Sequence, residues 1–338
     1  MQLIYQFFRL IRLSNILVMV LTMCLFYGLL SNYHFSPIQI DRQLSIVSQS
    51  FTSPSFIQTL GLKDRSFLLL ILSVALIAAA GNIINDYFDV KADRVNKPDR
   101  LIIDKFIKRR WAIILNWTLN GLGLLIATLL AYRLQNWWIF GVSLLAINLL
   151  YFYSAIYKRK FLTGNLIIAF LTALVPFYVF IYGGFSIFRT SRPFETDNSL
   201  FIKDNYLIII GYCSFAFLLN LIREIIKDMA DVKGDLLLGS KTLPIRIGFA
   251  KTKGLIFTLE FIGILSLSWY IINTLIIDAA PLNSDRRIFL FLLALVIFFL
   301  ILSVILILRK NQKKLYLLAS NCIKLAMLFG VISALFYV

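Results

Sequence analysis

A chain of 338 residues in which 60% are hydrophobic has too few polar side chains to cover the surface of a soluble protein of this length. In a membrane protein a net charge of +17 is explained by basic loops that set the orientation of the helices and contact anionic lipid headgroups. No nucleic-acid-binding motif accompanies this charge. Three isolated cysteines and a single histidine argue against a disulfide framework, a thiolate metal site and catalysis by a histidine cluster.

Apolar runs of roughly 18 to 25 residues recur along the chain, and this is the length that crosses ~30 Å of hydrocarbon. The alternating short strands of a membrane β-barrel are not seen in the sequence. We therefore expect an all-α, polytopic membrane protein with a single domain, residues 1–338, and about nine transmembrane helices in a bundle. The expected spans are 14–31, 66–86, 110–131, 136–155, 163–187, 206–227, 253–273, 288–308 and 316–337.

The chain begins with FFRLIRLSNILVMV, in which Arg9 and Arg12 precede an apolar stretch as they would in a signal sequence. No small-residue cleavage site follows this stretch, so we expect a retained first helix.

The basic residues predict the orientation of the spans. The loops on the side of the amino terminus carry 24 Lys and Arg, the opposite loops carry 9, and Lys324 lies inside the last span. The positive-inside rule then places the amino terminus in the cytoplasm and the carboxy terminus outside. We expect the inner or plasma membrane of a prokaryote, with the polar segments 32–65 and 188–205 as outer loops.

The first of two acidic clusters follows the second expected span, in GNIINDYFDVKADRVNKPDR, residues 81–100. If the helix continues through this segment, four polar residues fall within an arc of ~80°, namely Asn82, Asn85, Asp89 and Asp93. Asp86 lies at the edge of the arc. We call these residues the first stripe.

The second cluster follows the sixth expected span, in LIREIIKDMADVKGDLLLGSKTLPIRIG, residues 221–248. On the same arithmetic its acids fall within ~60° of one another and form the second stripe, Glu224, Asp228, Asp231 and Asp235. The two clusters together hold eight of the 17 acids of the chain. Their equivalent positions suggest two four-helix repeats plus a ninth helix.

Carboxylates crowded in this way raise one another's pKa unless a cation lies between them. Mg²⁺ prefers oxygen ligands and is commonly held by a few carboxylates together with substrate phosphates. We therefore expect the two stripes to face each other near the cytoplasmic surface and to bind a Mg²⁺–diphosphate complex, with neighbouring Lys and Arg on the phosphate oxygens. The plainer interpretation, solvated loops whose acids balance nearby bases, does not account for the matched spacing of the two clusters.

At these residues the chain resembles the UbiA-type intramembrane prenyltransferase family. Its first signature, NDxxDxxxD, matches residues 85–93, and its second, DxxxD, matches 231–235. Three further segments fit in the right order, RLSN at 12–15, YSAIYKRK at 153–160 and KTLPIRIG at 241–248. The residues around both motifs are most similar to those of the family branch that transfers geranylgeranyl to a glycerol-phosphate ether lipid. The segment LIIDKFIKRR after the first motif departs from the turn that family members often carry there.

The resemblance implies Mg²⁺-dependent transfer of a prenyl group from a polyprenyl diphosphate, such as geranylgeranyl diphosphate, to a lipid or aromatic acceptor in the membrane. The implied metal ligands are Asn85, Asp86, Asp89, Asp93, Asp228, Asp231 and Asp235. Four of these are the implied catalytic residues, Asp89, Asp93, Asp231 and Asp235. The implied diphosphate-binding residues are Arg12, Lys97, Arg100, Tyr153, Lys158 and Arg223. The implied partners are membrane lipid, the diphosphate donor and the lipophilic acceptor.

The main alternative is a cation-coupled transporter that uses the acidic clusters as an ion site. Both stripes lie at the ends of spans, whereas a pathway across the membrane favours acids near the midplane. A CDP-alcohol phosphotransferase also uses intramembrane acids and Mg²⁺, but its acidic pattern is absent here. Mg²⁺-dependent release of diphosphate would distinguish the enzyme from the transporter.

Overall fold

The structure is a computed structural model that describes residues 2–34, 64–96, 101–190, 198–237, 239–276 and 284–336. In chain order its helices are α1 (Gln2–Leu10), α2 (Leu13–His34), α4 (Arg65–Asn96), α5 (Arg109–Leu134), α6 (Trp138–Ala155), η4 (Tyr157–Arg159), α7 (Thr163–Thr190), α8 (Asn198–Leu237), α9 (Leu243–Ile276), α10 (Ser284–Leu308), α11 (Lys313–Ser333) and η5 (Ala334–Phe336). Across these ranges nine helices are long and apolar enough to cross a membrane, which confirms the all-α, polytopic fold expected from the sequence.

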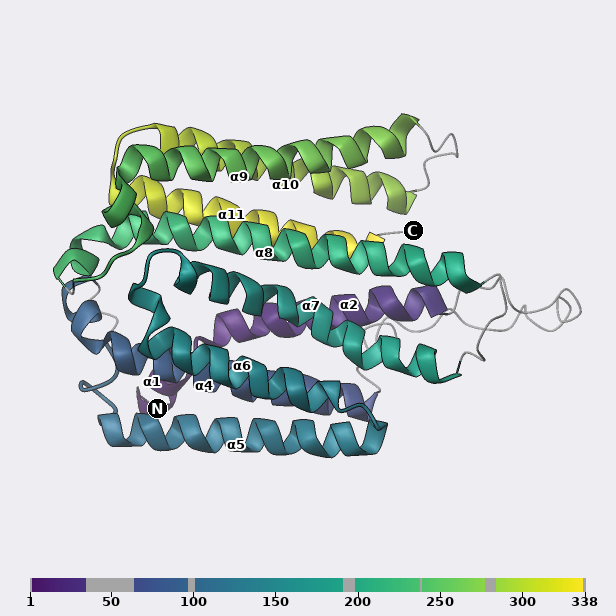
Figure 1. Ribbon diagram of the computed structural model, residues 1–338, viewed down its shortest axis with the longest axis horizontal. Helices are drawn as coiled ribbons and strands as arrows, with labels where there is room; N and C mark the ends of the chain where they lie inside the picture. The colour runs from purple at the N-terminus through teal and green to yellow at the C-terminus, as the bar shows by residue number, and fades with distance from the viewer. Residues whose placement is uncertain are drawn as a thin grey trace, which may run out of the picture.

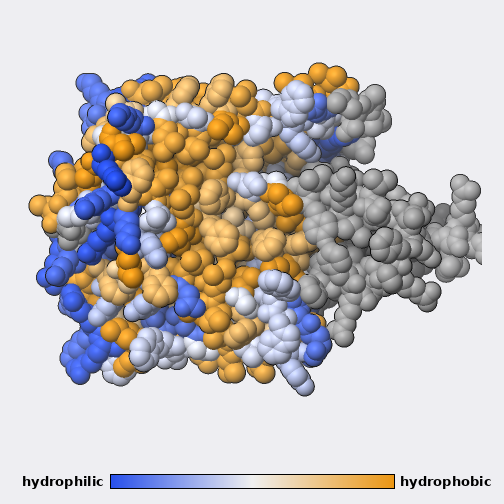
Figure 2. Space-filling model, viewed as in Figure 1, coloured by the Kyte–Doolittle hydropathy of each residue, from blue (hydrophilic) through white to orange (hydrophobic). Residues whose placement is uncertain are grey.

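The long helices run side by side along the longest axis of the molecule (Figure 1). On one side α4 packs against α5 and α6, and on the other α8 packs against α7, α9 and α11. The amino terminus lies near the end of the bundle where α4 and α8 finish, and the carboxy terminus lies at the opposite end. Apolar side chains cover the middle of the visible face, and hydrophilic side chains gather most densely at the end where α4 and α8 finish (Figure 2). This band is the surface expected of an integral membrane protein.

Both stripes lie on continuous helix, as the arc calculation assumed. The second span was expected to end at residue 86, but α4 continues to Asn96, and α8 continues ten residues beyond the expected end at 227. The seventh helix also begins earlier than expected, because α9 starts at Leu243 and bends at Gly248, whose φ of 82° interrupts the helical geometry. The helices extend beyond the expected spans because hydropathy marks where a helix leaves the hydrocarbon, not where its hydrogen bonding ends.

The amino-terminal segment contains a break that the sequence did not indicate. Helix α1 ends at Leu10, α2 begins at Leu13, and Arg12 between them has a φ of 54°. The Asn82 side chain of α4 donates a hydrogen bond of 2.9 Å to the carbonyl of Ile11 at this break. This contact satisfies a carbonyl that the interrupted helix leaves open. The break turns the chain so that Arg12 reaches Asp86 of α4.

Two further contacts position α4. At its amino-terminal end Asp64 accepts hydrogen bonds from the backbone N–H groups of Ser66 and Phe67, which caps the helix, and from the hydroxyl of Tyr182 on α7 at 2.6 Å. Further along, the Ser73 hydroxyl donates to the carbonyl of Gly123 on α5 at 2.7 Å. A Cβ at Gly123 would lie 2.8 Å from Ile77, so glycine permits the close approach of the two helices.

Residues 35–63 of the expected outer loop 32–65 lie outside the described residues. Of the expected loop 188–205, residues 191–197 lie outside them, whereas 188–190 belong to α7 and 198–205 to α8, so the helices extend into this segment. The suggestion of two four-helix repeats plus a ninth helix stays a prediction.

Candidate active site

One cavity of about 2050 Å³ lies between the helices and takes side chains from both stripes. Binding sites for drug-sized molecules are typically about 300–1,000 Å³, so this cavity has room for substrates with long chains. Its polar end is lined by α4, η4 and the end of α8, and its deeper walls are mostly apolar. The apolar lining includes Met19, Ile168, Val175, Phe215, Phe289 and Val296.

The first stripe forms a connected polar group at one wall of the cavity. Asn85 and Asp89 are both buried, and the Asn85 side-chain amide donates to the Asp89 carboxylate at 3.0 Å. Asp86 points to the amino-terminal break, where its carboxylate lies 2.5 Å from the guanidinium of Arg12. The oxygen atoms of this stripe therefore face both the cavity and a neighbouring cation.

Lys158 lies between the two stripes. It comes from η4, the short turn that follows α6, and its ammonium group forms an ion pair with Asp89. The same ammonium donates a hydrogen bond of 2.9 Å to the Asn85 carbonyl oxygen. It is also close enough to Asp228 and Glu224 to interact with them electrostatically. Lys158, which was expected to bind the diphosphate, thus pairs with a carboxylate of the first stripe in the structure.

The second stripe lines the opposite wall, where Asp228, Asp231 and Glu224 lie next to polar side chains. Asn165 of α7 donates to Asp228 at 2.8 Å, and the ammonium of Lys313 lies 3.5 Å from Asp231. Glu224 is paired with two cations of its own helix, Lys227 at 2.5 Å and Arg223 at 3.2 Å. Asp235, closer to the end of α8, also lines the cavity.

The loops that close the polar end are held together by backbone contacts. The Lys241 N–H, just after α8, donates to the carbonyl of Arg159 in η4 at 2.9 Å. At the start of α7, a Cβ on Gly164 would lie 2.9 Å from the carbonyl oxygen of Tyr157. Glycine at 164 therefore allows α7 to pack directly on the turn that carries Lys158.

Most of the site residues expected from the sequence come together in this cavity. The structure places there Arg12, Asn85, Asp86, Asp89, Tyr153, Lys158, Arg223, Asp228, Asp231 and Asp235. Asp93 belongs to α4, but its side chain is outside the described part of the structure, as are Lys97 and Arg100 entirely.

The structure adds polar residues that were not predicted as part of the site. They are Asn165, Thr172, Asn220, Lys227 and Lys324. Lys227 is one helical turn from Glu224 and could have been found from its spacing. The polar residues inside α7, α8 and α11 lie alone in apolar runs, where the sequence does not show which face they occupy.

The oxygen donors of the cavity fit Mg²⁺ shared with a substrate. Among the described side chains, no three of His, Cys, Asp and Glu are gathered closely enough to hold a metal by themselves. Mg²⁺ usually takes only one or two carboxylates and completes its shell with water and substrate phosphates. The carboxylate and amide oxygens of α4 and α8, with Lys and Arg beside them, have this chemistry.

Comparison with known proteins agrees with this chemistry. A family model described as the UbiA prenyltransferase family matches residues 45–328. A protein of Sulfurisphaera tokodaii named digeranylgeranylglyceryl phosphate synthase is 31% identical over 246 residues, which are 73% of this chain and 71% of that protein. A protein of the same name from Thermococcus gammatolerans is 31% identical over 252 residues, 75% of this chain and 78% of that protein.

Solved structures share the fold over nearly the whole chain. One, described as "Structural and mechanistic insights into the biosynthesis of Digeranylgeranylglyceryl phosphate synthase in membranes", has a TM-score of 0.58 at 24% identity and covers 99% of both chains. Another is a UbiA homolog from Archaeoglobus fulgidus bound to GPP and Mg²⁺, with a TM-score of 0.54 at 17% identity, covering 97% of this chain and 99% of the other.

Proposed function

The chain belongs to the UbiA prenyltransferase family, and on this premise we propose that it transfers a geranylgeranyl group from geranylgeranyl diphosphate to a hydroxyl of a glycerol-phosphate ether lipid. Members of the family are Mg²⁺-dependent, so the expected enzyme class and cofactor are confirmed at the level of the family. The alternative of a cation-coupled transporter has no support from the family.

The observation that carries the proposal is the convergence of both stripes on one cavity whose deeper walls are apolar. The polar end offers oxygen ligands and cations for a metal-bound diphosphate. The deeper end offers Met, Ile, Val and Phe side chains to an isoprenoid chain. The arrangement therefore matches an amphipathic substrate that has a highly charged head and a long hydrocarbon tail.

We assign the metal-binding role to Asn85 and Asp89 of α4 and to Asp228, Asp231 and Asp235 of α8. Mg²⁺, when bound there, neutralises the charge that develops on the leaving diphosphate. We assign Arg12 and Lys158, which line the same end of the cavity, to the phosphate oxygens of the donor.

With the diphosphate held in this way, the allylic C–O bond breaks and its electron pair leaves with the diphosphate. The acceptor hydroxyl then forms the new C–O bond, and its proton passes to the released diphosphate. The described protein groups contribute by orienting the head of the donor and by stabilising charge, which are the main sources of catalysis in such a site.

The acceptor is proposed from the names of the relatives. They are named as synthases of digeranylgeranylglyceryl phosphate, a glycerol phosphate that carries two geranylgeranyl groups. A prenyl transfer that forms this product adds the second group to geranylgeranylglyceryl phosphate. A cavity of about 2050 Å³ is compatible with two such chains at once.

We also propose that the stripes face the cytoplasm of a prokaryotic cell. The end of the bundle that carries them also carries the amino terminus, where basic loops are concentrated. Both substrates would then enter from the cytoplasmic leaflet of the plasma membrane.

The proposal is tested by incubating the purified protein with Mg²⁺, geranylgeranyl diphosphate and a panel of acceptors. The panel contains geranylgeranylglyceryl phosphate, hydroxybenzoate, naphthoate and homogentisate, and products are identified by mass spectrometry. We expect prenylation of the glycerol phosphate lipid with release of diphosphate, and no reaction when EDTA removes the metal. Prenylation of an aromatic acid in its place would contradict the proposed acceptor.

A further inference from the structure

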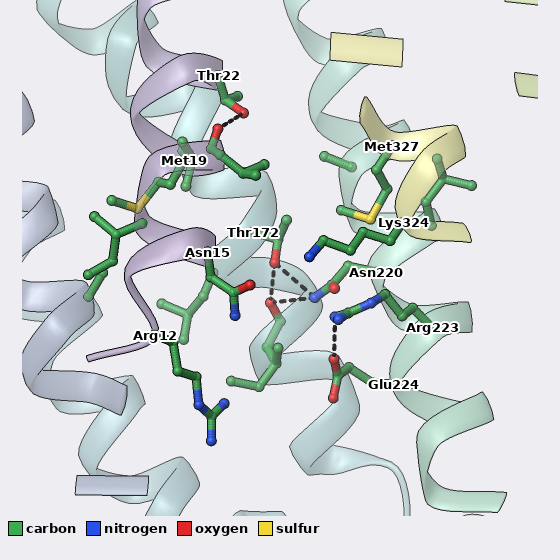
Figure 3. A pocket seen from close by; sticks show the side chains of 18 of the residues that line it. Arg12, Asn15, Met19, Thr22, Thr172, Asn220, Arg223, Glu224, Lys324 and Met327 are labelled. Atoms are coloured by element: carbon green, nitrogen blue, oxygen red, sulfur yellow. Dashed lines mark hydrogen bonds and ion pairs between the residues drawn. The ribbon is translucent and has the colours of Figure 1, made fainter. Parts of the chain in front are cut away.

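Lys324 is a charged residue in the interior of the last transmembrane helix, α11, and it lines the cavity. Figure 3 shows its ammonium group pointing inward, towards Asn220 of α8. It makes no hydrogen bond or ion pair with any residue that the structure describes. A cation at this depth costs free energy unless it faces a polar partner, so an ionisable residue inside a membrane indicates a functional site.

The depth of Lys324 follows from the packing of two antiparallel helices. Lys313, at the start of α11, lies 3.5 Å from Asp231 of α8. Eleven residues from this contact, α11 carries Lys324 and α8 carries Asn220. Both residues therefore lie ~16 Å deeper in the membrane than the contact. Lys324 is therefore well separated from the acids that we assign to the metal.

Polar groups of other helices surround the same space. The side-chain amide of Asn220 donates to the Thr172 hydroxyl of α7 at 2.8 Å, and Asn15 of α2 faces them from across the cavity (Figure 3). The guanidinium of Arg223 points to the same region. Its buried Nε has no hydrogen-bond partner in the described part of the structure. The cavity thus contains a second polar region, built from four helices, below the metal-binding acids.

This second region carries an excess of positive charge. Arg223, Lys227 and Lys324 contribute three cations, and the carboxylate paired with the first two of them is Glu224. The resulting charge of about +2 matches a phosphate monoester, which carries about −1.5 to −2 at neutral pH. The amide N–H groups of Asn220 already donate to the Thr172 hydroxyl and to the Ile168 carbonyl, so its carbonyl oxygen is suited to accept a hydrogen bond from the glycerol hydroxyl.

We propose that Lys324 and Arg223 form a subsite for the phosphate monoester head of the lipid acceptor, distinct from the site of the donor diphosphate. This inference rests on the proposed function and names the chemistry by which the acceptor is recognised. A phosphate held here keeps the adjoining glycerol hydroxyl inside the cavity, between the two polar regions. That hydroxyl then faces the carbon of the donor that is released from its diphosphate.

The phosphate groups of the donor diphosphate are the other anion that could bind to Lys324 and Arg223. Asp228 is the metal-binding acid nearest to this region on α8. Arg223 lies five residues before it, an axial separation of ~7.5 Å, and Lys324, level with Asn220, lies ~12 Å from it. A diphosphate bound through metal to these acids is shorter than the interval to Lys324 and leaves that ammonium unmatched. The separation therefore favours a second anion.

The test is direct binding of radiolabelled geranylgeranylglyceryl phosphate to the purified protein, without Mg²⁺ and without donor. Loss of a charge-assisted contact in Lys324→Met should raise the Kd about tenfold or more, and Lys324→Arg should restore most of the affinity. Lys314→Met is the matched control, because Lys314 is exposed on the same helix outside the cavity and should leave the Kd unchanged. Geranylgeranylglycerol, which lacks the phosphate, should bind the wild type and Lys324→Met equally.

A loss of affinity in Lys324→Met should not result from misfolding, because the substitution removes a charge that has no described partner. We expect its melting temperature to be no lower than that of the wild type. Wild-type affinity for the phosphate lipid in Lys324→Met would overturn the inference. A second arm measures binding of the unreactive geranylgeranyl thiolodiphosphate with Mg²⁺. We expect no change there, and weakened binding in this arm alone would assign Lys324 to the donor. Binding that depends on Lys324 in a protein that transfers no prenyl group would refute the proposed function and leave the subsite standing.

Discussion

The guanidinium of Arg12 lies 2.5 Å from the carboxylate of Asp86, although 74 positions separate the two residues in the chain. The contact depends on the break between α1 and α2, where Arg12 has a φ of 54° that residues other than glycine rarely adopt. Backbone strain of this kind persists where the surrounding structure enforces it, and it is common at functional sites. The ion pair joins the amino-terminal segment to the first stripe.

We predict that Arg12→Gly lowers kcat/KM about tenfold, because glycine accepts the backbone geometry but removes the guanidinium. Asp86→Asn should have a similar effect, and the double variant should be little worse than either single one, with a coupling of about 1 kcal/mol. Steady-state kinetics of the four proteins gives this value. Gln135→Gly, at a φ of 53° outside the cavity, is the control and should be fully active. Additive effects of the two changes would contradict the pairing.

A second prediction concerns competition between Lys158 and a metal for Asp89. Because the ammonium of Lys158 pairs with this carboxylate, Lys158→Met should tighten the binding of Mn²⁺ to the donor-free protein by several-fold. The same variant should lower prenyl transfer, since it removes a cation from the diphosphate site. Electron paramagnetic resonance titration measures the first effect. Lys160→Met, on an exposed neighbour outside the cavity, should change neither, and weaker Mn²⁺ binding in Lys158→Met would count against competition.

The third prediction uses the close packing at Gly164. A Cβ there would lie 2.9 Å from the Tyr157 carbonyl oxygen and 3.1 Å from the Cα of Lys158, so Gly164→Ala must displace the turn that positions Lys158. We expect kcat to fall about tenfold, because a misplacement of ~1 Å can have such an effect in a preorganised site. Gly141→Ala in α6 meets no atom within 4 Å and serves as the control. Full activity of Gly164→Ala would show that the position of this turn does not limit the reaction.

A fourth prediction concerns stability. Gly123→Ala places a Cβ 2.8 Å from Ile77 and 3.1 Å from the Ser73 carbonyl oxygen, which forces α5 away from α4 and should cost about 1–3 kcal/mol. Gly121→Ala, two residues away on the same helix, meets no atom within 4 Å and should be neutral or slightly stabilising. Thermal unfolding of both variants in detergent compares them directly. Equal melting temperatures would mean that the two helices are not packed as closely as described.

Much of this architecture could be predicted from local patterns in the sequence. The number of spans follows from hydropathy, and the two stripes follow from helical periodicity, because each depends only on residues that are neighbours along the chain. Lys158 was named from the sequence as a basic residue near the stripes, and the structure brings it to them. What the sequence could not give was the pairing of that lysine with Asp89, since this depends on how the turn after α6 packs against α4.

Two other features required the three-dimensional packing. The break at Arg12 contains neither Gly nor Pro and is stabilised by Asn82 from a distant helix, so no local signal marked it. Lys324 was recognised as a basic residue inside the last span, but its role depends on its direction. Only the packing of α11 against α8 shows that it faces the cavity.

The central claim is that Asp89 of α4 and Asp231 of α8 hold one metal–diphosphate complex between them. It is tested most directly by titrating Mn²⁺ into the protein saturated with geranylgeranyl thiolodiphosphate and measuring bound Mn²⁺ by electron paramagnetic resonance. We expect Asp89→Asn and Asp231→Asn each to weaken Mn²⁺ binding at least about tenfold. Asp285→Asn, in the first turn of α10, is the control and should bind Mn²⁺ as the wild type does. Unchanged Mn²⁺ affinity in either of the first two variants would contradict the claim.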